Sequence, residues 1–143
     1  MRKTLTALAL MLAMPATAQD LVTYEAEGGF DDVAFALENA IISRGLVVDH
    51  VSHVGEMLAR TGADVGASED LFVAADVYQF CSASLSRKVM EADPLNIVHC
   101  PYGVFVADSG DGVSVGYRVY PDGAMQEVQA LLDGIAREAA EGF

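Results

Sequence analysis

The chain lacks tryptophan and is poor in basic residues, with eight Lys and Arg against 21 Asp and Glu among its 143 residues. Nucleic acid binding depends on basic side chains that neutralise phosphates, so this composition argues against a nucleic acid ligand. A formal net charge of −13 at pH 7 also repels anionic lipid surfaces. We expect no nucleic acid and no membrane partner. We interpret the acidity as favouring solubility, with attraction of a basic partner as the alternative.

Cysteine is also scarce, since Cys81 and Cys100 are the two thiols of the chain. One pair can form a single disulfide, which excludes the densely bridged scaffolds of small secreted domains. The sequence contains neither C-x-x-C nor C-x-x-C-H. It therefore lacks a thioredoxin-like redox motif and a site for covalent haem attachment.

The first 18 residues have the three parts of a secretory signal peptide. Arg2 and Lys3 give a positive start, residues 5–14 are apolar, and residues 16–18 read Ala-Thr-Ala. The alternative is a membrane anchor, but the apolar run is shorter than the roughly 20 residues that a spanning helix needs. We expect residues 1–18 to be cleaved and residues 19–143 to form a single periplasmic or secreted domain.

Strand and helix patterns are interspersed along residues 19–143. The predicted strands cover residues 21–27, 46–54, 76–80, 96–108 and 113–120, and the predicted helices cover residues 30–45, 55–60, 83–92 and 124–140. The turn at residues 109–112 joins the last two strands as a hairpin. This order predicts an α+β fold: one compact domain with a mixed, mostly antiparallel sheet of about five strands and helices packed on one face.

Two segments resemble a known family. They are ALENAIISRGLVVDHVSHVGEML and YQFCSASLSRKVMEADPLNIVHCPYGVFV, and the likeness extends over roughly residues 21–139. Together they resemble the bacterial domain of unknown function 302 family, in the subset that keeps both cysteines. The resemblance implies a small α+β fold that tends to form dimers. It implies no reaction and no catalytic residues, although members are similar to proteins found beside sulfur-oxidation and other redox genes.

The two cysteines allow three interpretations. A secreted chain with two thiols most simply forms one structural disulfide, worth roughly 3 kcal/mol for a loop of about 20 residues. A redox pair is the second, because Cys81 precedes a predicted helix start whose dipole favours a thiolate, and Arg87 and Lys88 are close in sequence. The third is two buried, reduced thiols that pack as small hydrophobes.

Three histidines are weak candidates for metal ligands: His99, His50 and His53. On a straight strand, His50 and His53 face opposite ways, and so do His99 and Cys100. We therefore interpret them as exposed or hydrogen-bonded side chains, and we expect no metal and no cofactor.

An anion is the other ligand that the sequence favours. Ser82, Ser84, Ser86 and Arg87 lie at a predicted helix start, where free backbone N–H groups attract anions. The alternative is ordinary helix capping beside a solvated arginine. A G-x-S-x-G match around Ser114 lies in a predicted hairpin strand, so we treat it as chance, because a nucleophile elbow needs a strand, a sharp turn and a helix.

These observations leave two classes of function. The first is a non-enzymatic binding or accessory module that forms a homodimer and binds a protein or a small anionic ligand. We expect the dimer to pair through residues 113–120, taken as an edge strand. The second is a thiol-redox or sulfur-handling accessory protein, with Cys81 as the nucleophile and Cys100 as the resolving thiol.

Overall fold

The computed structural model describes residues 20–142, so the expected signal peptide lies outside the described residues. It contains five strands, four α-helices and two short 3-10 helices within that range. In chain order the elements are β1 (Leu21–Ala26), α1 (Phe30–Ile42), β2 (Val47–Ser52), α2 (Val54–Thr61), η1 (Ala63–Val65), β3 (Ala74–Cys81), α3 (Ala83–Ala92), η2 (Pro94–His99), β4 (Tyr102–Asp108), β5 (Val113–Arg118) and α4 (Met125–Glu141). No helix of residues 20–142 is long and apolar enough to cross a membrane.

The five strands form one sheet in the order β1-β5-β4-β3-β2, and every neighbouring pair is antiparallel. The α+β prediction is thus confirmed. The expectation that residues 113–120 form an edge strand is wrong, because β5 lies between β1 and β4. The edges are β1 and β2, and the register of β2 shifts between Val48 and His50, which is a β-bulge or irregularity.

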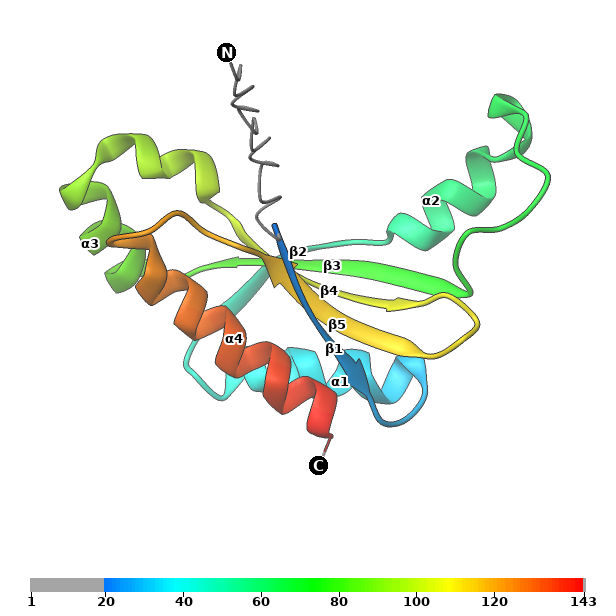
Figure 1. Ribbon diagram of the computed structural model, residues 1–143, viewed down its shortest axis with the longest axis horizontal. Coiled ribbons are helices and arrows are strands. Elements are labelled where there is room, and N and C mark those ends of the chain that lie inside the picture. Colours follow the sequence, from blue (N-terminus) through cyan, green and yellow to red (C-terminus); the bar gives the residue numbers. More distant parts are fainter. Residues whose placement is uncertain (1–19, 143) are drawn as a thin grey trace, which may run out of the picture.

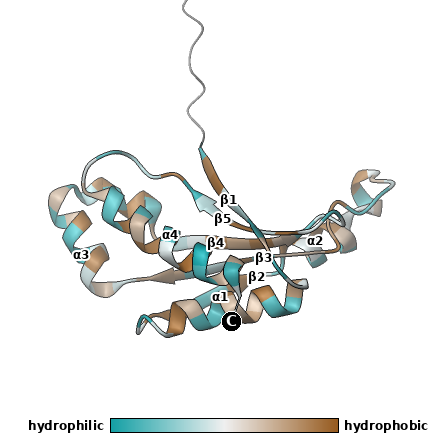
Figure 2. Cartoon of the chain, turned by 60° about the horizontal axis from the view of Figure 1, so that its bottom comes forward, coloured by the Kyte–Doolittle hydropathy of each residue, from teal (hydrophilic) through white to brown (hydrophobic). Residues whose placement is uncertain are grey.

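Helices α1 and α4 pack side by side against one face of the sheet (Figures 1 and 2). Alternate residues of each strand point toward them, and the largest fully buried side chains of this core are Tyr102, Phe80, Leu37, Ile41, Met125 and Leu132. Burying a side chain of this kind stabilises the fold by about 1.5–3 kcal/mol. In Figure 1, α2 extends beyond one end of the sheet, and α3 with η2 extends beyond the other.

The predicted strand over residues 96–108 is half wrong. Its first part belongs to η2, and β4 begins at Tyr102. The carboxylate of Asp93 accepts a hydrogen bond from the Leu95 N–H at 2.9 Å, and the Asn96 side chain donates to the Val89 carbonyl at 2.8 Å. These local bonds fold the segment back against α3, because they satisfy polar groups that a strand would have to pair across the sheet.

Candidate functional site

One face of the sheet is left uncovered by α1 and α4, and we call it the open face. Residues of neighbouring strands meet on it in register: Gln79 is opposite Gly103, Val77 is opposite Phe105, and Phe105 is opposite Gly116. The alternation of a strand places these residues on this face, because their neighbours along the chain point into the core. The side chains of Val77, Gln79 and Phe105 are half-buried.

A cavity of about 430 Å³ lies on the open face, and we call it the open-face groove. Its lining comes from four strands, from η2 and the residues after it, and from the segment that follows β5: Leu21, Val77, Gln79, Val98, His99, Pro101, Gly103, Phe105, Tyr117, Arg118 and Tyr120. Small-molecule sites are typically concave, mostly apolar, and between about 300 and 1,000 Å³ in volume. The groove therefore has the volume of a small-ligand site, with a lining that is both polar and apolar.

Two glycines shape the floor of the groove. A Cβ added at Gly103 would meet only the Cγ1 of Val77, at an ordinary 3.5 Å, so the absent side chain leaves space above β4. A Cβ added at Gly116 would meet the Val22 carbonyl oxygen at 2.4 Å and the Phe105 ring at 2.8 Å. Gly116 is therefore required for the ring of Phe105 to lie over β5. This packing role accounts for the second glycine of the G-x-S-x-G match.

An aromatic pair closes one side of the groove. The ring of His99 contacts the ring of Tyr120 edge-on, with 5.4 Å between centroids, and Tyr120 in turn contacts Tyr102 at 6.2 Å. Burial raises the pKa of Tyr120 to about 12, and Tyr102 adds to the rise, while Arg118 and the Gly103 backbone oppose it. Tyr120 is consequently a neutral phenol at physiological pH.

Arg118 supplies a positive charge to the groove, and it is unusual among the cations of residues 20–142. Four of the six Lys and Arg side chains in that range form ion pairs with carboxylates: Arg44, Arg87, Lys88 and Arg137. No described carboxylate lies within 4.0 Å of the Arg118 guanidinium, and the same holds for Arg60 on α2. Of these two unpaired cations, Arg118 is the one that lines the groove.

The two cysteines lie at disulfide distance at the end of the sheet that carries the groove. Cys81 is the last residue of β3 and Cys100 directly follows η2, with a Cα–Cα distance of 6.6 Å. The pair thus connects the end of η2, including His99, to the sheet. His99 and Cys100 do not alternate on a strand, as the sequence suggested, because η2 ends at His99.

The side chains of the predicted anion site at the start of α3 mostly contact other groups of the protein. The Ser82 hydroxyl accepts a hydrogen bond from the Leu85 N–H at 3.4 Å, and the buried Ser86 hydroxyl bonds the Tyr102 hydroxyl at 2.9 Å. Arg87 pairs with Glu91 at 2.7 Å, and Ser84 is exposed. This arrangement matches the capping alternative, and an anion at this helix start stays a prediction.

The other two histidines are not among the residues that line the groove. His53 precedes α2, and its Nδ1 lies 2.9 Å from the carboxylate of Asp76 on β3. His50 is exposed on β2, opposite Gln79. Among residues 20–142, no group of three or more His, Cys, Asp or Glu side chains is arranged to hold a metal ion.

Comparison with known proteins identifies the family of the chain. The family described as "Domain of unknown function DUF302" matches residues 22–141. The chain belongs to the DUF302 family. No curated protein matches this DUF302 chain in sequence.

A solved structure is similar to the DUF302 fold described above. It is the "Crystal structure of uncharacterized conserved protein DUF302 from Bacillus stearothermophilus", with 18% sequence identity and a TM-score of 0.61. The match covers 86% of this chain and 94% of that chain. At this identity the likeness supports the fold alone.

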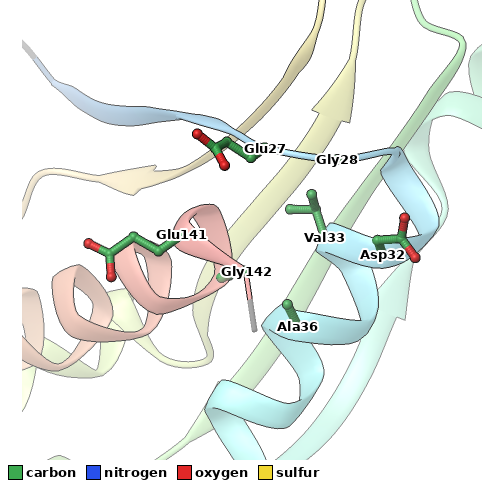
Figure 3. Close-up of a pocket in the computed structure, with 8 residues that line it drawn as sticks. Glu27, Gly28, Asp32, Val33, Ala36, Glu141 and Gly142 are labelled. Atoms are coloured by element: carbon green, nitrogen blue, oxygen red, sulfur yellow. The ribbon is translucent and has the colours of Figure 1, made fainter.

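A second cavity of this DUF302 chain, of about 320 Å³, lies between the start of α1 and the end of α4. Its lining includes three carboxylates, from Glu27, Asp32 and Glu141 (Figure 3). Figure 3 shows these side chains directed away from a common point. The geometry therefore does not form a cation cage, and we assign this cavity no ligand.

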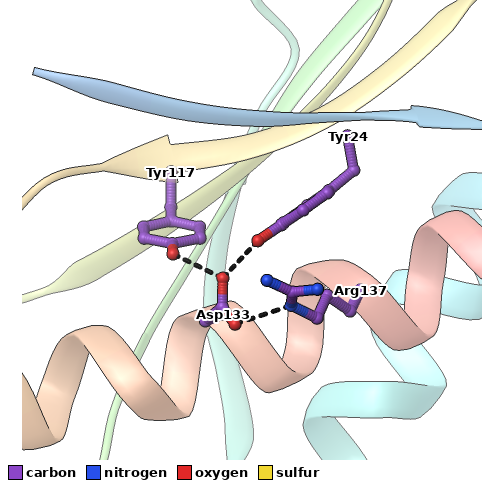
Figure 4. Close-up of polar contacts among 4 residues, drawn as sticks. All are labelled: Tyr24, Tyr117, Asp133 and Arg137. Atoms are coloured by element: carbon purple, nitrogen blue, oxygen red, sulfur yellow. Dashed lines mark hydrogen bonds and ion pairs between the residues drawn. The ribbon is translucent and has the colours of Figure 1, made fainter. Parts of the chain in front are cut away.

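A polar cluster joins α4 to the sheet and was not predicted from the sequence. The hydroxyls of Tyr24 on β1 and Tyr117 on β5 both donate to Asp133 on α4, the second at 2.7 Å, and Arg137 pairs with the same carboxylate at 2.7 Å (Figure 4). The Arg137 guanidinium also lies 4.8 Å from the centre of the Tyr24 ring. Each member has a partner, so we interpret the cluster as a clamp between the helix and the sheet.

The charges of this cluster follow from its contacts. Burial alone would raise the pKa of Asp133, but hydrogen bonds from both tyrosines and the ion pair with Arg137 hold it below its usual range. Burial, together with the hydrogen bond to Asp133, raises the pKa values of Tyr24 and Tyr117. The cluster is thus one carboxylate anion held by two neutral phenols and a cation.

Proposed function

We propose that the protein is a non-enzymatic binding or accessory module of the periplasm that holds a small molecule in the open-face groove. The observation that supports this proposal is the groove itself, a cavity of about 430 Å³ with a mixed polar and apolar lining, on a sheet face that α1 and α4 leave uncovered. The groove lies between the strands and the end of η2, which Cys100 connects to Cys81 on β3, so its walls form a rigid setting for a ligand.

The Cys81–Cys100 pair has a structural role in this proposal. A bond between the two sulfurs closes a loop that contains α3 and η2. Because Val98, His99 and Pro101 line the groove, the same bond fixes one wall of the site. The disulfide would thereby limit the conformational entropy that the protein loses when a ligand binds.

The binding proposal is tested with an apolar fluorescent probe and a groove-filling variant. N-phenyl-1-naphthylamine is a neutral aromatic molecule whose emission rises in apolar surroundings. We expect it to bind the wild-type protein and to lose that binding in Gly103→Val, because the added side chain extends from an uncrowded Cβ into the groove. Gly134→Ala on α4 is the control, since it lies outside the groove. Equal binding by all three proteins would refute the proposal.

We also propose a homodimer, which is tested by sedimentation and not by ligand binding, although Val98 belongs both to its proposed surface and to the groove lining. Three residues of η2 are exposed although apolar: Leu95 by 77%, Ile97 by 62% and Val98 by 79%. A contact between copies would bury them. Sedimentation should show a dimer at micromolar concentration that Ile97→Glu dissociates and that Leu71→Glu, an exposed position distant in the chain, leaves intact. A wild-type protein that sediments only as a monomer would contradict this.

A thiol-redox role is the second candidate, because both sulfurs lie at disulfide distance and both cysteines are half-buried rather than sealed in the core. Cys81 also lies two positions before Ala83, the first residue of α3, where the helix dipole favours a thiolate. The reduction potential against glutathione separates the two roles. A structural bond should have a potential below about −300 mV, and a redox-active bond a higher one.

A further inference from the structure

Three polar side chains in the groove have no hydrogen-bond or ion-pair partner within residues 20–142. They are Gln79 on β3, His99 at the end of η2 and Arg118 at the end of β5, and all three line the cavity. On the opposite face of the sheet, by contrast, the cluster around Asp133 is fully paired. Polar groups that converge on a cavity without protein partners are the usual means of orienting a ligand.

The charge of Arg118 determines which ligands these groups favour. Arg118 is a permanent cation, and a guanidinium binds carboxylate, sulfonate and phosphate groups through paired N–H donors. The Gln79 amide adds donors on the same open face. The chain as a whole carries a formal charge of −13, so an exposed, unpaired arginine at the border of the groove is a local exception to its acidity. This exception favours a ligand with negative charge at the Arg118 end.

The floor of the groove determines which chemical character the rest of the ligand should have. Val77, Phe105 and the bare backbone at Gly103 offer an apolar surface, and the aromatic pair of His99 and Tyr120 stands beside it. A single nearby guanidinium neutralises a single acid group, and the acidic surroundings disfavour a polyanion. The apolar floor would be poorly matched by a fully hydrated inorganic ion.

We propose that the open-face groove binds a small organic acid, with an apolar body on the Val77–Phe105 floor and one anionic group on Arg118. This inference rests on the proposed binding function and names the ligand class for the same site. The sequence also predicted a small anionic ligand, but assigned it to Ser82, Ser84 and Arg87. In the structure, Arg87 pairs with Glu91, whereas Arg118 has no carboxylate partner. We therefore place the anionic group of the ligand in the groove, beside Arg118.

The test uses two probes that share one aromatic body. N-phenyl-1-naphthylamine is neutral, and 8-anilinonaphthalene-1-sulfonate carries one sulfonate on the same ring system. We expect the sulfonate to bind the mature protein roughly tenfold or more tightly than the neutral probe, the effect expected of one charge-assisted contact. Arg118→Gln should abolish that difference and leave the affinity of the neutral probe within about twofold.

Arg60→Gln is the matched control, because Arg60 is the other unpaired cation of the described residues and lies on α2, away from the groove lining. It removes the same net charge and should leave both affinities unchanged. If the two arginine variants weaken the sulfonate equally, the preference is a long-range charge effect and the inference is overturned. Thermal melting followed by circular dichroism checks that each variant is folded, because a partly unfolded protein exposes core surface that also binds these probes.

The two proposals fail in distinguishable ways. If both probes bind equally and Gly103→Val removes both, the binding function stands and the anionic ligand class is wrong. If neither probe depends on position 103, the binding function itself is wrong. Where Gly103→Val does not fold, Gly103→Ala serves instead, since its Cβ meets only an ordinary contact with Val77, and it should weaken the neutral probe measurably.

Discussion

Loss of the Cys81–Cys100 bond should destabilise the protein by a predictable amount. The two residues are 19 positions apart, so the bond closes a loop of about 20 residues. In the chain-entropy description, such a loop restricts the unfolded chain enough to contribute about 3 kcal/mol to the free energy of unfolding. For a domain of this size, that corresponds to a melting temperature lower by about 10 °C.

The assay compares the melting temperature of the oxidised protein with those of Cys81→Ser, Cys100→Ser and the double variant, by circular dichroism without reductant. Each single variant should lose about the same stability, and the double variant should lose no more than either, because the bond is broken once. Strong reductant should lower the wild type to the level of the variants. Unchanged melting temperatures in all three variants would refute the structural role and favour the redox alternative or two ordinary thiols.

Two further predictions follow from particular contacts, and a third concerns export. Gly116→Ala should lower the free energy of unfolding by about 1–3 kcal/mol through overpacking against the Val22 carbonyl and the Phe105 ring, whereas Gly103→Ala on the same face should change it little in urea titrations. Because burial raises the pKa of Tyr120 from 10.0 to about 12, its contribution to stability is complete below pH 10 and is lost as pH rises through about 12. Urea unfolding at pH 8 and pH 11 should show this loss, and Tyr120→Phe should reduce it; an identical loss in the variant would contradict the assignment. The intact mass of protein from the periplasm should lack residues 1–18, and retention of Met1 in a cytoplasmic fraction would overturn the expected export.

Much of the fold could be predicted because its elements are encoded by local patterns. The helical spacing of Val128, Leu132 and Ile135 predicts α4, and these residues are fully buried against the sheet. The turn at residues 109–112 predicts the β4–β5 hairpin, which is confirmed. These features depend on neighbours in the sequence, so the pattern is sufficient to predict them.

The order of strands depends on distant segments, and here the prediction failed. β1 pairs with β5 across more than 80 residues, with Tyr24 opposite Val115, and no local pattern encodes that pairing. Because β1 pairs with β5, the strand that we expected to form the dimer lies inside the sheet. The apolar residues before Cys100 predict a strand, but Asp93 and Asn96 form local hydrogen bonds and the segment folds into η2.

The groove could be anticipated only in part. Gly103 interrupts an otherwise apolar strand, and a glycine at such a position often marks a close approach by a ligand or another backbone. Arg118 is the single cation of its strand, but the sequence does not show which cations find a carboxylate partner, because the pairs of Arg44 and Lys88 join residues distant in the chain.

The central claim is that the open-face groove is the ligand site, and NMR mapping tests it most directly. Uniformly nitrogen-15-labelled mature protein would be titrated with N-phenyl-1-naphthylamine while amide shifts are followed. The largest changes should fall on Gly103, Phe105 and Gly116, with smaller ones at Gln79 and little change on the outer side of α1. Shifts concentrated around Glu27 and Glu141 at the acidic cavity, or spread evenly over the chain, would contradict the assignment.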